Sequence, residues 1–237
     1  MKTARTRIPT ACDPDTLSSI ALFRDLTPSQ WQQLGETLHH KTFPAGTTLM
    51  TVEQPGEVVY FILHGTVKVH IEQEDGSDVI ISILGPGECV GEMSLLDQVG
   101  RSATVVAIEE SELLWLDRTT FRSFLLEMST LAYNLARVLS ARLRLANDQI
   151  QALAALEAEK RIARHILAFA QRYGSLLPNG DLCIPIRLTQ SDIAALTGAS
   201  REHTNKILVS YKDRGYISAD RRHYLTIHNQ QALAKCC

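Results

Sequence analysis

The sequence predicts an α+β protein: an antiparallel jelly-roll barrel (a double-stranded β-helix), a long dimerisation helix and a winged helix-turn-helix. Three observations predict this fold class. Short β-rich runs separated by turn residues occupy residues 43–115, as in an all-β sandwich or barrel. Apolar residues then recur at helical spacing over residues 119–173, where Pro and Gly are absent. Finally, two capped helices flank a glycine turn within residues 189–214, which is typical of a helix-turn-helix.

The barrel is predicted from hairpin signals between strand-forming runs. His64-Gly65 and Asp75-Gly76 mark tight turns, and Gly85-Pro86-Gly87 forces another. No crossover helix separates the runs, so we expect roughly eight strands with antiparallel pairing. The clearest strand candidates are residues 58–63, 66–71, 79–84, 103–108 and 113–116.

The periodic segment is too long for one globular helix. We expect it to break near residues 158–160, with a second helix over residues 161–173. Its first part carries an apolar stripe with alternating spacings of four and three residues, the seam of a two-stranded coiled coil. We expect this stripe to join two copies of the chain; packing on the protein's own barrel is the alternative. The stripe consists of Ala132, Ala136, Leu139, Leu143, Ala146, Ile150 and Leu153, flanked by Arg142, Arg144 and Asp148.

The last part of the chain predicts a winged helix-turn-helix. Residues 173–180 are rich in turn residues and predict a surface loop. Thr189 caps a helix over residues 190–196, and Ser200 caps a second one over residues 201–214, which Gly215 closes. Two short strands follow, at residues 216–218 and 224–227, and the wing between them is residues 220–223.

Composition narrows the class of protein. The 237 residues are 45% hydrophobic and 21% charged, enough to bury one large core or two modest ones. No apolar run approaches the roughly 20 residues that span a bilayer, and the start of the chain leads into polar sequence. We therefore expect a cytoplasmic protein that meets no membrane.

The cysteines and histidines do not suggest a metal. Five cysteines are scattered without CxxC spacing, and no HExxH motif is present among the eight histidines. We expect no metal and a reducing compartment. Cys236-Cys237 is interpreted as an exposed chain end, with a redox handle as the alternative.

Charge is unevenly distributed along the chain. Residues 185–237 hold eight Lys/Arg against four Asp/Glu, so this segment carries +4 while the whole chain carries −2. A basic module on an acidic body favours nucleic-acid contact by one end. An ordinary solvated face is the alternative on charge alone.

The most informative stretch is residues 91–104. Its glycine allows close backbone approach to a ligand, its glutamate accepts bonds from ribose hydroxyls, and its arginine forks onto phosphate oxygens. Backbone N–H groups of a short helix at residues 92–95 would add donors for an anion. By themselves such residues are also common in structural turns.

This stretch resembles the cyclic-nucleotide-binding domain of the cyclic-AMP receptor protein family (the CRP/FNR superfamily). The resemblance covers residues 18–228, runs through the long helix and the helix-turn-helix, and includes six further positions in the barrel: Gly46, Gly56, Phe61, Gly65, Asp75 and Gly76.

The resemblance implies roles for individual residues. Glu92 would bind the ribose 2′-hydroxyl, and Arg101 and Ser102 would hold the cyclic phosphate. Asn147 would meet the adenine, whereas Ala146 replaces a hydroxyl residue of the family and cannot hydrogen-bond. Cyclic AMP is the expected effector; cyclic GMP, a cyclic dinucleotide or a pocket that binds nothing are alternatives. The expected ligand-binding residues are Gly91, Glu92, Met93, Arg101, Ser102 and Asn147.

The second capped helix is the expected DNA reader. The resemblance places Arg201 and Glu202 at the family's base-reading positions, and Lys206 where the family has arginine. These side chains suit G·C-containing sites, so we expect a half-site similar to TGTGA with relaxed discrimination at Lys206. A solvated Glu202–Lys206 pair is the alternative. Thr189 and Ser200 are expected phosphate contacts, with plain helix capping as their alternative.

Together these features predict a homodimeric transcription regulator that binds double-stranded DNA under nucleotide control and meets RNA polymerase. One alternative is a regulator that binds DNA without a ligand. The other is a cyclic-nucleotide-binding module that controls a protein partner. We expect no enzyme, because no catalytic arrangement is recognisable. The expected domains are an amino-terminal extension (1–17), the barrel (18–130), the dimerisation helix (131–157) and the DNA-binding domain (158–237).

Overall fold

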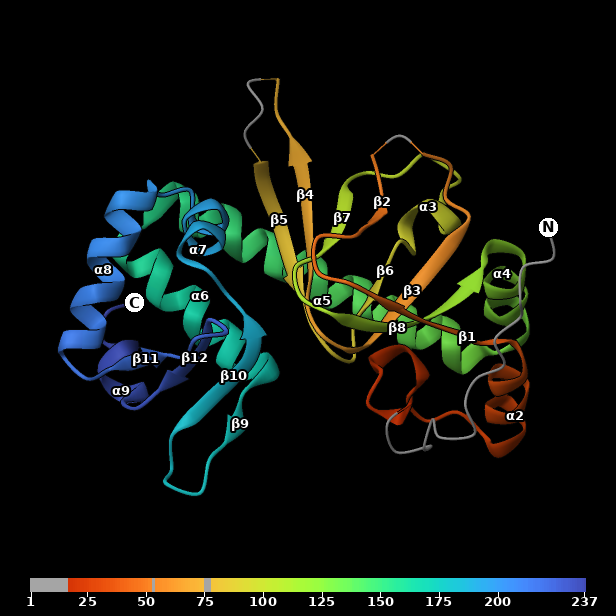
Figure 1. The fold of residues 1–237 in the computed structure, drawn as a ribbon. Helices are drawn as coiled ribbons and strands as arrows, with labels where there is room; N and C mark the ends of the chain where they lie inside the picture. Colours follow the sequence, from red (N-terminus) through yellow and green to blue (C-terminus); the bar gives the residue numbers. More distant parts are fainter. Residues whose placement is uncertain (1–16, 53, 75–77) are drawn as a thin grey trace. The chain divides into compact units, whose positions relative to one another are not determined.

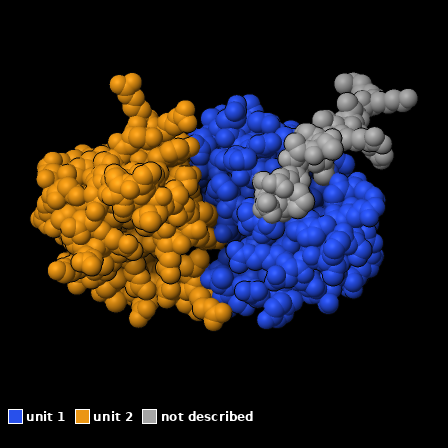
Figure 2. Space-filling view, turned by 90° about the horizontal axis from the view of Figure 1, so that it is seen from below, with its two compact units in different colours: residues 1–71, 83–143 blue, residues 72–82, 144–237 orange. Residues whose placement is uncertain are grey.

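The computed structural model describes residues 17–52, 54–74 and 78–237 (Figure 1). The expected amino-terminal extension, apart from Leu17, and the expected Asp75-Gly76 turn therefore lie outside the described residues. The chain divides into two compact units, Met1–Ile71 with Ile83–Leu143 and Glu72–Ser82 with Arg144–Cys237 (Figure 2).

The first unit contains the predicted antiparallel barrel, apart from residues 72–82, which are assigned to the second unit. Its strands form two four-stranded sheets, in the orders β1-β8-β3-β6 and β2-β7-β4-β5. Neighbours that are distant in sequence, such as β1 and β8, make this a jelly roll and confirm the α+β fold class. The strands are β1 (His39–Phe43), β2 (Thr48–Met50), β3 (Val58–His64), β4 (Val67–Glu72), β5 (Asp78–Leu84), β6 (Cys89–Val90), β7 (Thr104–Ala107) and β8 (Ser111–Asp117).

The turn between β3 and β4 requires glycine. Gly65 has φ +87°, and a Cβ there would lie 2.6 Å from the carbonyl oxygen of Glu110. A side chain at this position would therefore be strained and would clash with backbone. The predicted tight turn at His64-Gly65 is confirmed, but β3 and β4 belong to different sheets and do not pair as a hairpin.

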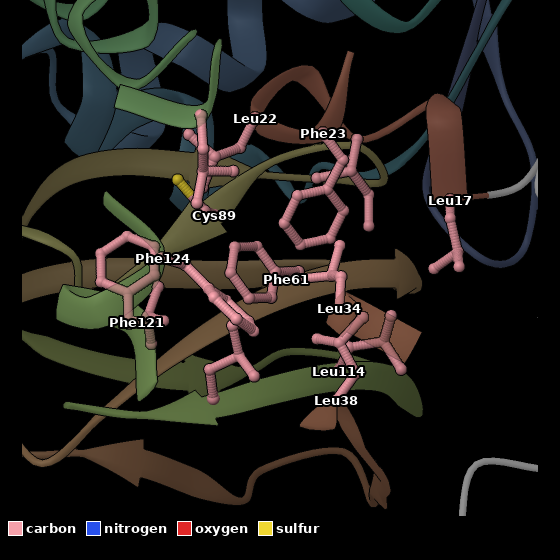
Figure 3. Packing of buried hydrophobic residues seen from close by; sticks show 14 of the residues in the cluster. Leu17, Leu22, Phe23, Leu34, Leu38, Phe61, Cys89, Leu114, Phe121 and Phe124 are labelled. Atoms are coloured by element: carbon pink, nitrogen blue, oxygen red, sulfur yellow. The ribbon is translucent and has the colours of Figure 1, made fainter. Parts of the chain in front are cut away.

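The first unit has two core clusters: one lies between the two sheets, and the other lies between one sheet and the helices around it. Figure 3 shows Phe61 among the aromatic rings of this core, and its centroid lies 4.6 Å from that of Phe23 and 6.5 Å from that of Phe121. Phe23 belongs to a short 3₁₀ helix, η1 (Ala21–Phe23), which is followed by α2 (Pro28–Thr37). The sequence analysis predicted neither element. The buried Asn134 amide holds η1 in place by donating to the carbonyl oxygens of Leu22 and Arg24.

The long periodic segment forms three helices. These are α4 (Arg118–Glu127), α5 (Ser129–Ala155) and α6 (Ala158–Tyr173). The break between α5 and α6 falls at residues 156–157, just before the expected position. The break at Met128 was not predicted, because Met128 keeps the apolar periodicity while its backbone turns extended, with φ −111° and ψ 91°.

The second unit contains the helix-turn-helix. The helices α7 (Gln190–Thr197) and α8 (Arg201–Asp213) lie within one residue of their predicted bounds. A four-stranded sheet in the order β11-β12-β10-β9 accompanies them. Its strands are β9 (Ser175–Leu176), β10 (Leu182–Arg187), β11 (Ile217–Ala219) and β12 (Tyr224–Ile227). The sequence analysis missed β9, β10 and the last helix, α9 (Gln230–Ala234).

Within the described part of the chain, no helix is both long and apolar enough to span a membrane.

Candidate functional site

Gly91 gives the candidate ligand cassette its shape. It follows β6 with φ +90°, and a Cβ at this position would approach Arg101 Nη1 to 2.7 Å and the Val58 carbonyl oxygen to 3.1 Å. Only glycine fits both the backbone angle and the space. Gly91 therefore lets the chain enter the short helix α3 (Met93–Leu96) with Glu92 turned inward.

Glu92 is buried and paired with an arginine of α5. Its side chain is only 2% exposed, and its Oε1 accepts a hydrogen bond of 2.6 Å from Arg142 Nη1. Arg142 Nη2 also donates to the Cys89 carbonyl oxygen at 2.5 Å. A buried carboxylate requires such a partner, because leaving the charge unpaired would cost several kcal/mol, about 3–5 by analogy with other buried pairs. The sequence analysis treated Arg142 only as a flank of the stripe.

Burial and neighbouring charges shift the pKa of Arg142 in opposite directions. Burial lowers the pKa of Arg142, but Cys89, Glu92 and Glu88 together raise it above its ordinary value. Burial, reinforced by Glu92, raises the pKa of the Cys89 thiol to about 12. The arginine is therefore a permanent cation and the thiol stays protonated.

Arg101 is held by backbone and by a serine. Nη1 donates to the Gly91 carbonyl oxygen at 2.7 Å and to Ser94 Oγ at 2.8 Å, while Nη2 donates to the Val58 carbonyl oxygen at 2.7 Å. A guanidinium has five N–H groups, so within the described residues the Nε hydrogen and one Nη2 hydrogen have no partner. Burial lowers its pKa, yet a guanidinium remains charged. A fixed, charged fork with two spare donors suits an oxyanion.

A cavity of about 390 Å³ lies beside this guanidinium. Its size falls within the range of ligand pockets, about 300–1,000 Å³. Of the expected ligand-binding residues, Arg101, Ser102 and Met93 line it, whereas Gly91 and Glu92 do not. Its remaining lining residues, which the sequence analysis did not name, are Ser94, Asp97, Val99 and Gly100.

Asn147 lies five residues beyond Arg142 on α5 and belongs to the second unit, where its side chain is exposed. Ala146 next to it is exposed as well. The structure thus gives Asn147 no contact that would establish its expected role.

The helix-turn-helix is shaped by caps and one glycine. Thr189 Oγ1 accepts from the amide of Asp192 at 3.1 Å, and the Asp192 side chain accepts from the Thr189 amide at 2.9 Å, a reciprocal capping box. Ser200 Oγ accepts from the His203 amide at 3.2 Å. Gly198 ends α7 with φ +60°, a left-handed conformation that favours glycine. Thr189 and Ser200 therefore both cap helices.

The two faces of α8 differ in character. Thr204, Ile207, Leu208 and Tyr211 are buried against the unit, whereas Arg201, Glu202, Asn205 and Lys206 are exposed. Glu202 Oε1 accepts from Lys206 Nζ at 2.8 Å, with both side chains largely in solvent. An exposed i,i+4 pair contributes little to stability, about 0.3–0.5 kcal/mol. This helix therefore presents an exposed polar row whose internal ion pair is weak.

Arg161, which the sequence analysis did not single out, ties the start of α6 to the helix-turn-helix. Its Nε donates to the Thr197 carbonyl oxygen at 2.7 Å and its Nη1 to that of Leu156 at 2.6 Å. One cation thus satisfies carbonyl groups just beyond α5 and at the end of α7. No sequence motif marks this role.

Within residues 17–52, 54–74 and 78–237, no three His, Cys, Asp or Glu side chains are grouped so that they would hold a metal ion.

Comparison with known families matches each unit to one domain. The family described as "Cyclic nucleotide-binding domain" matches residues 40–128, and the "Crp-like helix-turn-helix domain" matches residues 160–236. A "CRP-like cAMP-activated global transcriptional regulator" of Mycobacterium tuberculosis is 33% identical over 221 residues, covering 93% of this chain and 98% of the relative. A "Cyclic AMP receptor protein" of Thermus thermophilus is 31% identical over 197 residues, covering 83% and 87%.

Solved structures of other proteins share this fold. The catabolite activator protein of Thermus thermophilus superposes with a TM-score of 0.51 at 28% identity, covering 91% of this chain and 97% of that one. FixK2 of Bradyrhizobium japonicum superposes with a TM-score of 0.73 at 20% identity, covering 84% and 97%, and is a likeness of fold alone. With both domains matched and near full-length relatives above 30% identity, the chain belongs to the CRP/FNR family of transcription regulators, which bind DNA under the control of a ligand-sensing domain.

Proposed function

We propose that this protein is a homodimeric transcription regulator whose DNA binding is controlled by cyclic AMP. The observation that carries the proposal is the Arg142–Glu92 ion pair, at 2.6 Å between Nη1 and Oε1. It joins the loop expected to bind the ribose directly to α5, the expected dimerisation helix. A ribose hydroxyl that bonds to Glu92 would compete with Arg142, so ligand binding would act on α5.

The pocket fits a cyclic phosphate. Two N–H groups of Arg101 remain available, and the hydroxyl of the exposed Ser102 lines the same cavity. Together they would bind two oxygens of one singly charged phosphate. Met93 and Val99 add apolar surface at the cavity, which suits a base ring. Gly91 would shape the loop, Glu92 would bind the ribose, and Asn147 would contact the base.

The dimer would form through the stripe on α5. In the single chain its later members are exposed: Leu143 by 63%, Ile150 by 66% and Leu153 by 48%. Leucine and isoleucine that repeat at coiled-coil spacing and face water favour a second copy of the same helix. Leu131 and Leu135, on another face of α5, pack on the barrel core. Leu139 of the stripe also packs against this core, so the alternative of packing on the barrel applies to that member, whereas Leu143, Ile150 and Leu153 stay exposed.

The DNA site proposed is a palindrome of TGTGA-like half-sites. Arg201 would fork onto guanine, Glu202 would accept from cytosine, and Lys206 would contact guanine as a point charge. Thr189 and Ser200 would place backbone amides of their helix starts near phosphates. A two-fold dimer then reads half-sites about one helical turn, about 34 Å, apart. The DNA site would lie on the bacterial chromosome, so the protein would act in the cytoplasm. RNA polymerase would be its further partner. The proposed function assigns the protein no catalytic role.

The test is binding of the purified protein to a labelled TGTGA palindrome at fixed salt, with no nucleotide, with cyclic AMP, with cyclic GMP and with a cyclic dinucleotide. Salt is fixed because phosphate contacts make affinity steeply salt-dependent. A scrambled palindrome is the DNA control, and Arg101→Ala is the pocket control. Sedimentation under the same conditions reports the oligomeric state, with Leu143→Glu as the variant expected to give monomers.

Tight binding to the palindrome only with cyclic AMP, lost in Arg101→Ala, would support the proposal. A response to another nucleotide would reassign the effector. Equal binding without any nucleotide would leave a constitutive regulator, and failure to distinguish the palindrome from its scrambled form would reject the DNA site.

A further inference from the structure

A serine, a histidine and an aspartate of the second unit form a hydrogen-bonded chain. His228 Nε2 lies 2.8 Å from Ser218 Oγ, and His228 Nδ1 lies 2.7 Å from Asp181 Oδ2. The three residues come from separate elements: Ser218 is on β11, His228 follows β12, and Asp181 precedes β10. This order of groups is the one that activates a hydroxyl nucleophile.

The carboxylate fixes the direction of the chain. An ionised carboxylate only accepts hydrogen bonds, so the proton of a neutral His228 ring must be on Nδ1. Nε2 is then an acceptor, and the only hydrogen available to it in this contact is that of Ser218 Oγ–H. The tautomer needed for a general base is thus selected by Asp181.

Asp181 is held in its own position. Asn179 Nδ2 donates to its Oδ2 at 2.8 Å, and its amide donates to Asn179 Oδ1 at 3.1 Å. Its carbonyl oxygen accepts from the Leu177 amide at 2.8 Å. These bonds keep the carboxylate pointed at the His228 ring. The His228 side chain is 36% exposed, and the Asp181 side chain is 19% exposed.

We propose that Ser218 is an activated nucleophile and a site of covalent acylation by activated acyl donors, such as acyl phosphates or thioesters. In the step, Ser218 Oγ bonds to the carbonyl carbon of the donor while His228 Nε2 takes the hydroxyl proton. The bond from that carbon to the leaving group breaks, and the proton passes from His228 to the leaving group. The products are an ester on Ser218 and the free phosphate or thiol, with no change in oxidation state.

The reaction is expected to stop at the ester. The amides of His228 and Asn229, which follow β12, both donate to the Tyr216 carbonyl oxygen, and Ser218 itself is in register with Thr226 in the sheet. These amides are therefore not available to stabilise an oxyanion, the contribution that turnover requires. The ester should accumulate as a stoichiometric modification and break the bond between Ser218 and His228.

The experiment uses the full-length protein and p-nitrophenyl acetate as the activated ester. Release of p-nitrophenolate is followed by absorbance, and the acetylated residue is identified by peptide mass spectrometry. Ser200, an exposed serine of the same unit whose hydroxyl oxygen accepts from the backbone amide of His203, is the internal control. General-base assistance is worth about 10²–10⁴-fold, so acetylation of Ser218 should be at least about 100-fold faster than that of Ser200.

Variants test the chain of three groups. Ser218→Ala should abolish the adduct, and His228→Gln should reduce acetylation to the rate at Ser200, because the ring nitrogen that accepts the hydroxyl proton is removed. His203→Gln, on an exposed histidine of α8, is the matched control and should leave the rate unchanged. Asp181→Asn should also slow the reaction, because an amide group can donate to Nδ1 and reverse the tautomer. Asp181 is thus a positioning residue, and its variant should keep the wild-type circular dichroism.

Acetylation confined to lysines or cysteines, or a Ser218 rate equal to that of Ser200, would overturn the proposal. So would an unchanged Ser218 rate in His228→Gln. If His228→Gln alters the circular dichroism, the Ser218 acetylation rate of Asp181→Asn is compared with that of the wild type instead. An unchanged rate in Asp181→Asn would then overturn the proposal.

Discussion

Replacing Arg142 by methionine tests how the ligand cassette is held. The change keeps most of the side-chain length but removes the partner of Glu92, whose side chain is 2% exposed. Breaking a buried ion pair on one side costs about 3–5 kcal/mol. Because the Arg142 side chain is itself 25% exposed, solvent screens part of the pair, and we expect the lower end, about 3 kcal/mol. This corresponds to a decrease in Tm of roughly 10 °C.

The assay is thermal unfolding at fixed protein concentration without nucleotide, followed by circular dichroism. Arg144→Met is the matched control, since Arg144 is exposed on the same helix, and it should shift the free energy of unfolding by less than about 0.5 kcal/mol. Adding Glu92→Gln to Arg142→Met should restore at least about 1 kcal/mol, because a buried amide costs less than a buried carboxylate. A loss below about 0.5 kcal/mol for Arg142→Met, or a double variant less stable than the single one, would refute this account.

Four further predictions follow from single features. Thr204→Val should raise the free energy of unfolding by about 1 kcal/mol in urea titrations, since the buried Thr204 hydroxyl has no hydrogen-bond partner among the described residues; a lower free energy of unfolding would disprove that. Gly91→Ala should lower stability by at least about 1 kcal/mol and weaken cyclic AMP binding in calorimetry, because its φ is +90°; unchanged affinity would contradict its role. Arg201→Ala should weaken binding to the palindrome by about 1–3 kcal/mol, whereas Lys206→Arg should sharpen preference for guanine in a base-substitution series. Cys89, with a pKa of about 12, should resist iodoacetamide at pH 8 until the protein unfolds, because the thiolate forms only as the pH approaches that value.

Local signals in the sequence were sufficient for much of the fold. Caps and glycine turns predicted α7 and α8 to within one residue, because Thr189, Ser200 and Gly198 act on neighbouring backbone groups. Short β-rich runs predicted five of the barrel strands, β3, β4, β5, β7 and β8, whereas β1, β2 and β6 were not named. The pocket residues Arg101 and Ser102 came from a resemblance in a continuous segment, and both line the cavity.

The missed elements lacked a local signal or carried a conflicting one. Pro185 argues against a central strand, yet β10 lies between β12 and β9. The register of β10 with β12 shifts between Ile184 and Arg187, and this irregularity accommodates the proline. The short helix η1 has no periodicity of its own and is held by Asn134.

The sequence by itself therefore determined the fold class, the order of barrel, long helix and helix-turn-helix, and the polar row on α8, since each depends on residues a few positions apart. Only the tertiary structure decided which distant side chains meet. Arg142 reaches Glu92 across 50 residues, and His228 reaches Asp181 across 47. Such pairs depend on how strands and helices are brought together by burial of a common core, and that assembly leaves no periodic or local pattern in the chain.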